Sequence, residues 1–442
     1  MNGPYMYELN KIPYEDHSTA SYEYHKFFPT QNSDLNNYSA IRYVISAREH
    51  LYHFHNAFFE AKGTVVKDDG GHAFETKAGI AFTHNPFPYM FRNIAYKMEG
   101  QTIESVDYLG QVSTMFHYAT FNSNKTYESG LEYFWCPDRT VDADKDNKGW
   151  LTRQRILIED THDKGSFTMR IPLTMLLGFA EFTKVITGVS HEFELTRQED
   201  YHALFRGNDI PTYAGGEGAN AACPLAKIDL KSLVLWIPIA KADGVVNINL
   251  KEAQLNSKID YPIAFYQRRG AMVEVTAAVT DWNWTFSTIN FKERPQYLIL
   301  GFQDDFKTTQ KSNYALFQHK DIQKISCMVN DVRIPYDSAE ADFKNMDLGG
   351  FYTQLQDFNA NYLQIDPLLH ECGINPVSFR DLRTLFVFDL TKHERDIKAE
   401  VVTSRIEVHF GTATQANLRA YACILNKREL FLKSDGGRLV IR

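Results

Sequence analysis

The sequence predicts an all-β protein with two domains, and three observations support that prediction. The chain has 442 residues, more than the ~250 to 300 at which a single hydrophobic core stops growing. Aromatic residues make up 14% of it, including 31 Phe and 24 Tyr, and such side chains fit the pleated, half-buried surface of a sheet. Alternation of apolar and polar residues, typical of a strand with one buried face, recurs in both halves. Each domain would hold roughly 200 residues, enough for a sandwich of about eight strands.

The strands of the first half follow from this period-2 pattern. Apolar residues occupy alternate positions over residues 41–45 and 94–98, and Glu99 and Gly100 then supply a turn. The clearest strand alternates two sets of side chains, Val189, His191, Phe193 and Leu195 with Ser190, Glu192, Glu194 and Thr196. We expect the first set to face the core.

A short helical turn precedes that strand. Leu173, Leu176 and Leu177 stand at the i, i+3, i+4 spacing of one helical face, and Gly178 then interrupts the pattern.

The second half contains one helix and ends in strands. Period-2 alternation covers residues 405–410 and continues over 418–424 and 430–432, and residues 434–437 supply the turn of a last hairpin. The helix is predicted from apolar residues at i, i+4 and i+7, namely Phe351, Leu355 and Phe358.

The domain boundary is placed where both periodicities fail. The stretch GNDIPTYAGGEGANAACP, residues 207–224, is rich in Gly, Pro and Asn, which interrupt helices and strands. This predicts an extended N-terminal arm over residues 1–37, a first domain over 38–206, a linker over 207–224 and a second domain over 225–442. The arm would become ordered on assembly.

The charge distribution argues against a nucleic-acid-binding protein that works through a basic tail. The net charge is −8, and the first forty residues carry only Lys11 and Lys26 against five acidic side chains. The last residues, GGRLVIR, are no more basic. Because backbone phosphates are bound by clustered Lys and Arg, we expect no strong direct binding of nucleic acid.

Cysteine spacing and hydropathy predict a protein without a disulfide framework or a membrane span. The five cysteines lie far apart and form no CxxC motif. Apolar runs such as residues 233–240 are shorter than the ~18 residues of a membrane helix. No leader with a charged and then an apolar segment opens the sequence.

Two segments were considered as metal sites, and neither is predicted to be one. His53 and His55 would share one face of a strand with His50 nearby, but no HExxH motif or carboxylate accompanies them. In DADKDNKG, Asp142, Asp144 and Asp146 have the alternate spacing of half a calcium loop, yet the expected glycine and the final glutamate are missing. A solvated loop is preferred, with weak Ca²⁺ binding left open.

The remaining motifs predict no catalytic residue and no cofactor. The chain lacks a GxSxG elbow and a P-loop. Trp282 and Trp284 could stack a sugar, but at alternate positions of a strand they are more typical of a core or a subunit interface. We therefore expect a protein that is not an enzyme.

Several segments resemble one protein family in the family's order along the chain. Residues 165–206, GSFTMRIPLTMLLGFAEFTKVITGVSHEFELTRQEDYHALFR, combine the helical turn, the strand and an Arg-and-acidic loop, and they resemble the major capsid proteins of Polinton/Maverick elements, adintoviruses and virophages, of the adenovirus-like lineage. Other matching segments are EYHKFFPTQNSDLNNYSAIRYVI (23–45), GIAFTHNPFPYMFRNIAYKMEGQTIESVDYLGQVSTM (79–115), RPQYLILGFQ (294–303), ISCMVNDVRIPY (325–336), LRTLFVFDLTKH (382–393) and LFLKSDGGRLVIR (430–442). Residues 79–115 resemble the family's hairpins. The chain departs from the family around residues 141–149 and in the 210s.

The resemblance implies a double jelly roll, two jelly-roll β-sandwiches with a few short helices in loops. It further implies a structural major capsid protein that forms pseudo-hexagonal homotrimers in an icosahedral virion. Its partners would be itself, neighbouring capsomers and penton or minor capsid proteins, after synthesis in the host cytoplasm and with assembly in the nucleus as an option. Two alternatives stay open: a carbohydrate-binding or hydrolytic jelly-roll protein, and a capsid gene captured by a host.

Overall fold

The structure is a computed structural model of the chain. Residues 208–222 of the expected linker and residues 1–18 of the expected arm lie outside the described residues. The structure describes residues 19–30, 34–37, 39–46, 50–75, 78–159, 163–207, 223–255, 260–288, 294–304, 309–329, 332–335, 340–366, 371–393, 402–435 and 438–441.

Eight strands form the first sandwich. Their two antiparallel sheets run β1-β11-β4-β8 and β2-β9-β6-β7. Counted by place along the chain, these orders are 1-8-3-6 and 2-7-4-5, the interleaved order of a jelly roll. The bounds are β1 Thr19–Phe27, β2 Ala40–Ile45, β4 Phe58–Lys67, β6 Phe91–Met98, β7 Gln101–Asp107, β8 Ser166–Pro172, β9 His191–Arg197 and β11 Ala226–Ala242.

The second sandwich repeats the same topology. Its sheets run β12-β19-β14-β17 and β13-β18-β15-β16, which again reads 1-8-3-6 and 2-7-4-5. The predicted all-β fold of two jelly rolls is therefore confirmed. The bounds are β12 Asp260–Glu274, β13 Asp281–Thr288, β14 Arg294–Asp304, β15 Ile322–Val329, β16 Val332–Ile334, β17 Phe386–Asp389, β18 Val402–Phe410 and β19 Leu418–Asp435.

Short strands and helices complete the fold. β3 Leu51–Tyr52 pairs with β11, β5 Ile80–Phe82 pairs with β10 Leu204–Arg206, and β20 Arg438–Ile441 pairs with β19. The α-helices are α1 Pro86–Tyr89, α2 Leu109–Thr120, α3 Ser123–Tyr133, α4 Lys148–Gln154, α5 Gly244–Leu255, α6 Phe351–Leu363 and α7 Pro376–Asp381. The 3-10 turns are η1 Phe54–Asn56, η3 Leu173–Met175, η4 Gly178–Glu181, η5 Asp200–His202, η6 Phe343–Asn345 and η7 Thr391–His393, and η2 Arg155–Glu159 is a π-helix. No helix of the described residues is long and apolar enough to span a bilayer.

The strands predicted from alternation are present, and their apolar residues face the cores. β2, β6, β9 and β18 alternate buried and more exposed positions as expected. Two further expectations also hold. The last hairpin joins β19 to β20, with Asp435 opposite Arg438. Helix α6 buries Phe351, Leu355 and Phe358. Burial of alternate side chains between two sheets is what stabilises each sandwich.

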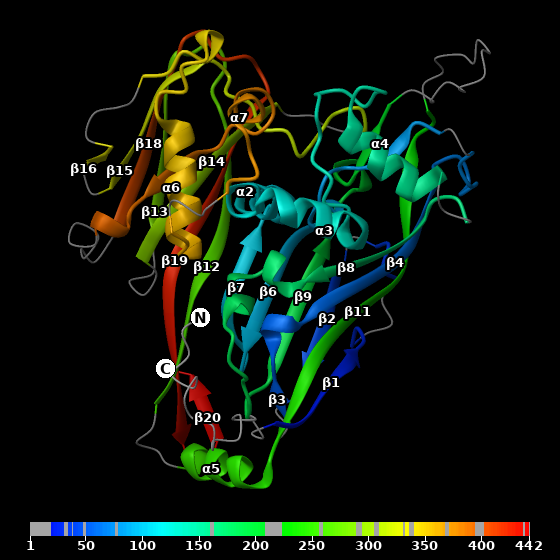
Figure 1. Ribbon diagram of the computed structural model, residues 1–442, viewed down its shortest axis with the longest axis vertical. Helices are drawn as coiled ribbons and strands as arrows, with labels where there is room; N and C mark the ends of the chain where they lie inside the picture. The colour runs from blue at the N-terminus through cyan, green and yellow to red at the C-terminus, as the bar shows by residue number, and fades with distance from the viewer. Residues whose placement is uncertain are drawn as a thin grey trace, which may run out of the picture.

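The two sandwiches stand side by side, and α2 fills the space where they meet (Figure 1). All twelve residues of α2 are buried. The helix packs on β6 and β7 of its own sandwich and on β12, β14 and β19 of the other. Its apolar residues Leu109, Val112 and Phe116 lie on one side of the helix, and its buried polar residues have partners within the protein, as where Ser113 donates to the carbonyl oxygen of Met175 at 3.0 Å.

Helix α2 shows that the hairpin expectation for residues 79–115 was wrong in its last part. Residues 79–115 were expected to form hairpins, and the β6–β7 hairpin is there, but the chain turns helical at Leu109. The sequence of this segment does carry a helical pattern, with apolar Leu109, Val112 and Phe116 at i, i+3 and i+7 and polar residues such as Gln111 and His117 on the other side, and the interpretation as hairpins overlooked it.

The short helical turn predicted at Leu173 is present as the 3-10 turn η3. Leu173, Leu176 and Leu177 are buried as one apolar face requires.

The expected domain limits also need correction. β1 lies inside the expected N-terminal arm but is the first strand of the first sandwich, paired with β11. β11 was assigned to the second domain, yet it pairs with β4 and closes the first sandwich. The Gly- and Pro-rich stretch over 207–224 thus falls between the seventh and eighth strands of one sandwich. The passage between sandwiches comes later, over residues 243–259, which include α5.

Candidate functional site

The candidate functional site is the junction where the edge strands β7 and β12 approach each other. β7 ends one sheet of the first sandwich, and β12 begins one sheet of the second. Gln267 donates from Nε2 to the carbonyl oxygen of Ile103 at 3.2 Å, and the backbone N–H of Arg268 donates to Oε1 of Glu104 at 2.7 Å. These bonds run through side chains, so the sheets remain separate while their edges are joined.

Four residues form a polar group at this junction, which we call the Glu104 cluster: the buried Glu104 and Arg268 and the half-buried Glu181 and Tyr362. The Glu104 carboxylate also accepts from the backbone N–H groups of Gly178 and Phe179, at 3.0 and 2.8 Å. Glu181 accepts from Arg268 Nη2 and from the Tyr362 hydroxyl, each at 2.5 Å. Glu104 and Glu181 come from the first sandwich and Arg268 and Tyr362 from the second, so the bonds that Arg268 and Tyr362 donate cross the junction, whereas those from Gly178 and Phe179 stay within the first sandwich.

Electrostatics in this cluster reflect its burial. Burial raises the pKa of Glu104 to about 7, against the opposing effect of the hydrogen bonds from Phe179 and Arg268. Burial also holds the pKa of His117 well below its ordinary value, and the nearby Arg268 guanidinium adds to this. That guanidinium lies 3.9 Å from the centre of the Phe116 ring on α2, a cation–π contact. The junction therefore combines one buried positive charge with compensating acids and an aromatic face.

Two glycines allow the sandwiches to approach backbone to backbone. A Cβ added at Gly178 would lie 1.8 Å from the carbonyl oxygen of Tyr266, and one at Gly270 would lie 1.9 Å from that of Asp107. Both distances are far below van der Waals contact, so only glycine fits at either position. The mutual placement of the sandwiches depends on these close crossings.

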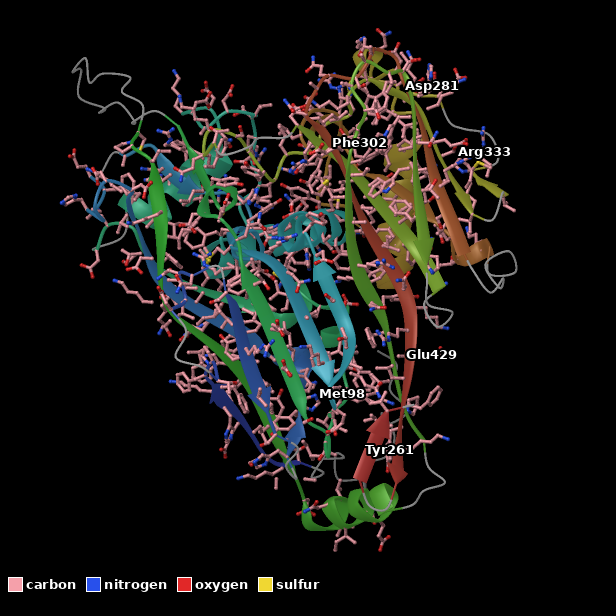
Figure 2. The ribbon with its side chains drawn as sticks, turned by 180° about the vertical axis from the view of Figure 1, so that it is seen from behind. Met98, Tyr261, Asp281, Phe302, Arg333 and Glu429 are labelled. Atoms are coloured by element: carbon pink, nitrogen blue, oxygen red, sulfur yellow. The ribbon has the colours of Figure 1, made fainter. Side chains whose placement is uncertain are left out.

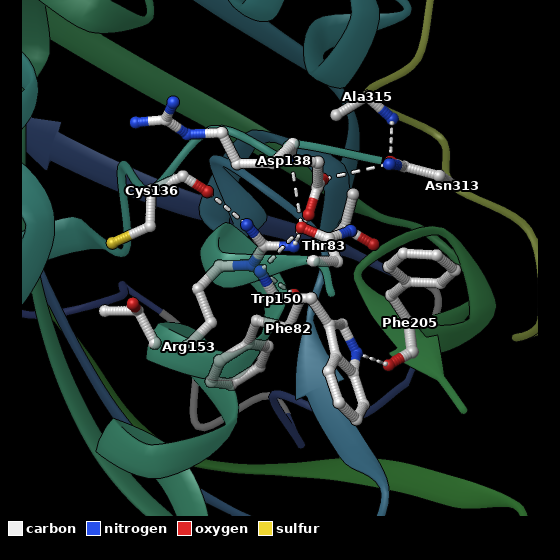
Figure 3. A network of polar contacts seen from close by, with 12 residues as sticks. Phe82, Thr83, Cys136, Asp138, Trp150, Arg153, Phe205, Asn313 and Ala315 are labelled. Atoms are coloured by element: carbon white, nitrogen blue, oxygen red, sulfur yellow. Dashed lines mark hydrogen bonds and ion pairs between the residues drawn. The ribbon is translucent and has the colours of Figure 1, made fainter. Parts of the chain in front are cut away.

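A second buried network, the Asp138 cluster, joins the sandwiches through loops (Figure 3). Its members are Asp138, Arg153, Asn313 and Arg383. Arg153 Nη2 lies 2.6 Å from Asp138 Oδ1, while Arg153 also donates to the carbonyl oxygens of Phe82, at 2.8 Å, and Cys136. From the second sandwich, Asn313 donates to Asp138 Oδ2 at 2.9 Å, and Arg383 donates to the Asp138 carbonyl oxygen at 2.7 Å.

The Asp138 cluster is well satisfied for a buried ion pair. Arg153 is fully buried and Asp138 nearly so, and desolvation of such charges is costly unless hydrogen bonds replace the lost water. Both carboxylate oxygens of Asp138 and several guanidinium nitrogens have partners. Such a network fixes one relative orientation of the loops that it joins.

A pocket of about 750 Å³ opens at one end of the junction. It is lined by residues 139–141 of the first sandwich and by loops of the second. Its charged groups are largely matched within the chain, as in the 2.7 Å pair of Lys320 with Asp304. His319 stacks on Phe343 at 4.6 Å between ring centres, and burial lowers the pKa of its imidazole.

The histidines considered as ligands are engaged in other contacts. His53 and His55 lie at the 3-10 turn η1, so the expected shared strand face is wrong. His53 contacts the Tyr22 hydroxyl at 2.7 Å and the Thr183 carbonyl oxygen at 3.1 Å through its two ring nitrogens. Nδ1 of His55 lies 3.1 Å from the carbonyl oxygen of Ala180. His50, the third candidate, has its ring 6.1 Å from that of Tyr52.

The acidic loop around Asp142, Asp144 and Asp146 leads into helix α4. Asp142, Asp144 and Asp146 are all exposed. Asp144 Oδ1 accepts from the backbone N–H groups of Asp146 and Asn147, and the buried Asn147 caps α4 by accepting from Trp150 N at 3.2 Å. The asparagine that breaks the calcium pattern is therefore the N-cap. Over the whole described part of the chain, no group of three or more His, Cys, Asp or Glu residues could hold a metal ion.

The tryptophan pair faces the second core. Trp282 on β13 is only 8% exposed, and its ring lies 6.2 Å from that of Phe302. Trp284 on the same face packs against Phe286 at 4.1 Å between ring centres. This arrangement matches the core interpretation.

Sequence reasoning missed the residues that make the junction. Glu104, Asp138, Arg153 and Arg268 stand in no motif. Glu104 stands among polar residues in QTIESVD and Arg268 stands beside Arg269, so nothing in the sequence identifies their partners.

The comparisons with known proteins agree with this geometry. A model of the family described as double jelly roll-like domain matches residues 80–430. No curated protein matches the chain by sequence.

Solved capsid structures share the fold. The structure of the Sputnik virophage is similar at a TM-score of 0.62 and 11% identity, covering 100% of this chain and 92% of that one. The mavirus major capsid protein is similar at a TM-score of 0.55 and 10% identity, covering 100% and 95%. The PBCV-1 virus capsid is similar at a TM-score of 0.56 and 11% identity, covering 98% of each chain. At such identities the likeness is one of fold.

Proposed function

Because the chain belongs to the double jelly roll-like domain family, we propose that it is the structural major capsid protein of an icosahedral virus or virus-like element, and not an enzyme. The observation that carries this proposal is the duplication: two sandwiches of identical topology are locked into one unit by buried contacts. A lattice subunit needs such a rigid unit, because its neighbours must meet it at fixed angles. The similar fold of the Sputnik, mavirus and PBCV-1 capsid proteins over nearly their whole length supports this.

The assembly unit that we propose is a homotrimer. Three chains with two sandwiches each would place six similar sandwiches around one axis, which gives a pseudo-hexagonal capsomer. Function then resides in the surfaces between chains and between capsomers, and the further partners are penton or minor capsid proteins. The protein would be located in the virion, after synthesis in the host cytoplasm. We assign it to the group of Polinton/Maverick elements, adintoviruses and virophages.

The net charge of the chain supports a capsid shell that does not bind its genome directly. The net charge is −8, and Arg268, one of two adjacent arginines that could have joined a basic patch, is buried and paired with Glu181. The protein should bind duplex DNA only weakly at physiological salt, without a steep dependence on salt concentration.

Light scattering coupled to size-exclusion chromatography tests this proposal. One chain has a mass of 50.9 kDa, so a capsomer should elute as a single species of about three times that mass. Interfaces of an obligate kind bury at least ~2,000 Å², so the trimer should persist on dilution through the micromolar range. A monomer at every concentration would overturn the proposal.

A further inference from the structure

The pocket of about 750 Å³ at the end of the junction is large enough to hold a small organic ligand. Figure 1 shows that this end of the molecule carries α4 and α7, whereas α5 lies at the opposite end. Figure 2 marks the same end with Asp281, whose carboxylate lies 2.7 Å from Nδ1 of His409, and marks the other end with Tyr261. Most of the lining residues belong to loops, which is where a rigid scaffold commonly carries its binding residues.

In the described part of the chain, every charged side chain at the pocket but one has a partner of opposite charge. Each carboxylate of the lining lies within 2.9 Å of a cationic group: Asp304 pairs with Lys320, Asp321 with Lys344, and Asp381 with Arg380. The exception is Arg139, whose exposed guanidinium has neither an ion pair nor a hydrogen bond among the described residues. The pocket therefore presents one unmatched positive charge, which favours an anionic group on the ligand.

The backbone of Arg139 is held in place at the pocket wall. Its N–H donates to Oδ1 of Asn147, the N-cap residue of α4, at 3.1 Å. The preceding residue, Asp138, is bonded to Arg153 of the first sandwich and to Asn313 of the second. Because the main chain is already fixed, little of its conformational freedom is left to be lost when the guanidinium binds a ligand.

Neutral polar side chains surround this charge. Nδ1 of His319 accepts from the backbone N–H of Asp321 at 2.9 Å, and burial lowers the pKa of the ring. The imidazole is therefore neutral with its proton on Nε2, where it can donate to a ligand oxygen. The buried Oε1 of Gln318 has no hydrogen-bond partner among the described residues. Further hydroxyl and amide groups of the lining belong to Ser378, Thr412 and Gln415.

The turn that carries His319 has a strained backbone. Lys320 and Asp321 both have positive φ, 50° and 57°, which is unfavourable for residues other than glycine. The backbone N–H of Ile322 donates to the carbonyl oxygen of His319 at 3.0 Å and closes the turn, while the His319 ring stacks on Phe343. Backbone strain persists only where the surrounding structure holds it, and it is concentrated at ligand sites.

We propose that this pocket binds a sugar that carries one carboxylate. Arg139 pairs with the carboxylate, and the polar groups of His319 and Gln415 bond the sugar hydroxyls. One negative charge matches the one unmatched guanidinium, whose planar fork fits a carboxylate. A divalent cation does not fit, because no group of His, Cys, Asp or Glu in the described residues could hold one. The tryptophan pair considered for sugar stacking does not line this pocket.

This inference goes beyond the proposed capsid function, because it concerns a ligand of the protein and not its assembly. The sugar could be free or could be the end of a glycan chain, and both sources present the same carboxylate and hydroxyl groups to the pocket.

Saturation-transfer nuclear magnetic resonance with a matched pair of sugars tests the proposal. Methyl β-glucuronide and methyl β-glucoside differ only at the sixth carbon, which is a carboxylate in the first and a hydroxymethyl group in the second. The wild-type protein should bind the glucuronide at least about tenfold more tightly, since a hydrogen-bonded charge pair supplies that difference.

Variants at Arg139 assign the difference to the pocket. Arg139→Gln should bind the glucuronide no better than the glucoside, and Arg139→Lys, which keeps the charge but loses the bidentate fork, should have an intermediate affinity. Arg92→Gln is the matched control, because Arg92 is also exposed but does not line the pocket, and it should bind like the wild type. Far-ultraviolet circular dichroism confirms that each variant is folded.

Several results would overturn the site. These are equal binding of the two sugars by the wild type, saturation transfer to neither of them, and unchanged binding of the glucuronide by Arg139→Gln. Acetate that binds as tightly as the glucuronide would show that the pocket recognises charge alone, which also contradicts a sugar site. Immobilised oligosaccharides that end in glucuronic acid separate the two sources: retention that is lost in Arg139→Gln assigns the ligand to glycan ends, and binding of the soluble glycoside alone assigns it to free sugars.

The mass of the protein in solution keeps this test separate from the capsid proposal. A trimer that binds neither sugar would overturn the ligand site and leave the capsid function standing. A monomer that binds the glucuronide through Arg139 would support the site and overturn the capsid proposal.

Discussion

Substituting Gly270 by alanine tests whether the junction depends on close backbone contact. The added Cβ would lie 1.9 Å from the carbonyl oxygen of Asp107 and 2.9 Å from Cγ2 of Val112. Close carbon-to-oxygen contacts in proteins are about 3.3 Å or longer, so β12 must withdraw from β7 by more than ~1 Å. Two residues away, Arg268 N donates to Glu104 at 2.7 Å, and that withdrawal would lengthen this bond.

The size of the effect follows from the steric overlap at Gly270 and from the lengthened hydrogen bond between Arg268 and Glu104. Overpacking of a tight contact costs about 1 to 3 kcal/mol, and a weakened hydrogen bond to a charged group adds about 1.5 to 3 kcal/mol. We expect the free energy that couples the sandwiches to fall by about 2.5 to 6 kcal/mol, the sum of these two losses. The clash lies between the sandwiches, at Asp107 of the first and Gly270 of the second, so the coupling between them should be affected more than the stability of either one.

Differential scanning calorimetry measures this coupling. The wild type should unfold with the two sandwiches coupled, and Gly270→Ala should separate the unfolding into two transitions or lower the first one markedly. Gly244→Ala is the matched control, because an added Cβ there meets nothing within 4 Å, and it should leave the transition unchanged. If Gly270→Ala unfolds like the wild type, the close approach does not determine how the sandwiches are joined.

Three further predictions address other parts of the molecule. Asp138→Ala leaves the buried Arg153 unpaired and should cost about 3 to 5 kcal/mol in urea unfolding, whereas unchanged stability would show that the Asp138 cluster is dispensable. Burial lowers the pKa of His191 to about 3, so the unfolded chain takes up a proton near the ordinary value of 6.5 and the folded chain does not. Stability should therefore fall as pH drops from about 6.5 towards 3, by up to ~1.4 kcal/mol per unit, and His191→Gln should lose less over that range; an equal loss in both proteins would contradict this. Trp282→Ala empties part of the second core and should destabilise it by about 3 to 5 kcal/mol, while a stable variant that loses binding on a glycan array would favour the carbohydrate-binding alternative.

Local patterns allowed much of the fold to be predicted. Strands such as β9 and β18 have one buried and one solvent-exposed face, so apolar and polar residues alternate along their sequences. Helix α6 has a polar side, so Phe351, Leu355 and Phe358 reveal its period. Helix α2 has a comparable pattern, with Leu109, Val112 and Phe116 at i, i+3 and i+7, and it was missed because the resemblance suggested hairpins for the whole of residues 79–115.

The domain boundary and the junction depend on contacts that sequence patterns do not record. Residues 207–224 lack helical and strand periodicity. This is expected both of a linker between domains and of a connection between two strands of one domain. Only the pairing of β11 with β4 distinguishes the two. The partners Glu104 and Arg268 are 164 residues apart, so nothing local connects them.

Electron microscopy of the purified protein tests the central claim most directly. Negatively stained particles at micromolar concentration should show three-fold capsomers with a pseudo-hexagonal outline, and raising the concentration should yield sheets or closed shells. Isolated particles the size of one chain at every concentration, with neither capsomers nor shells, would contradict the assignment of this chain as a major capsid protein.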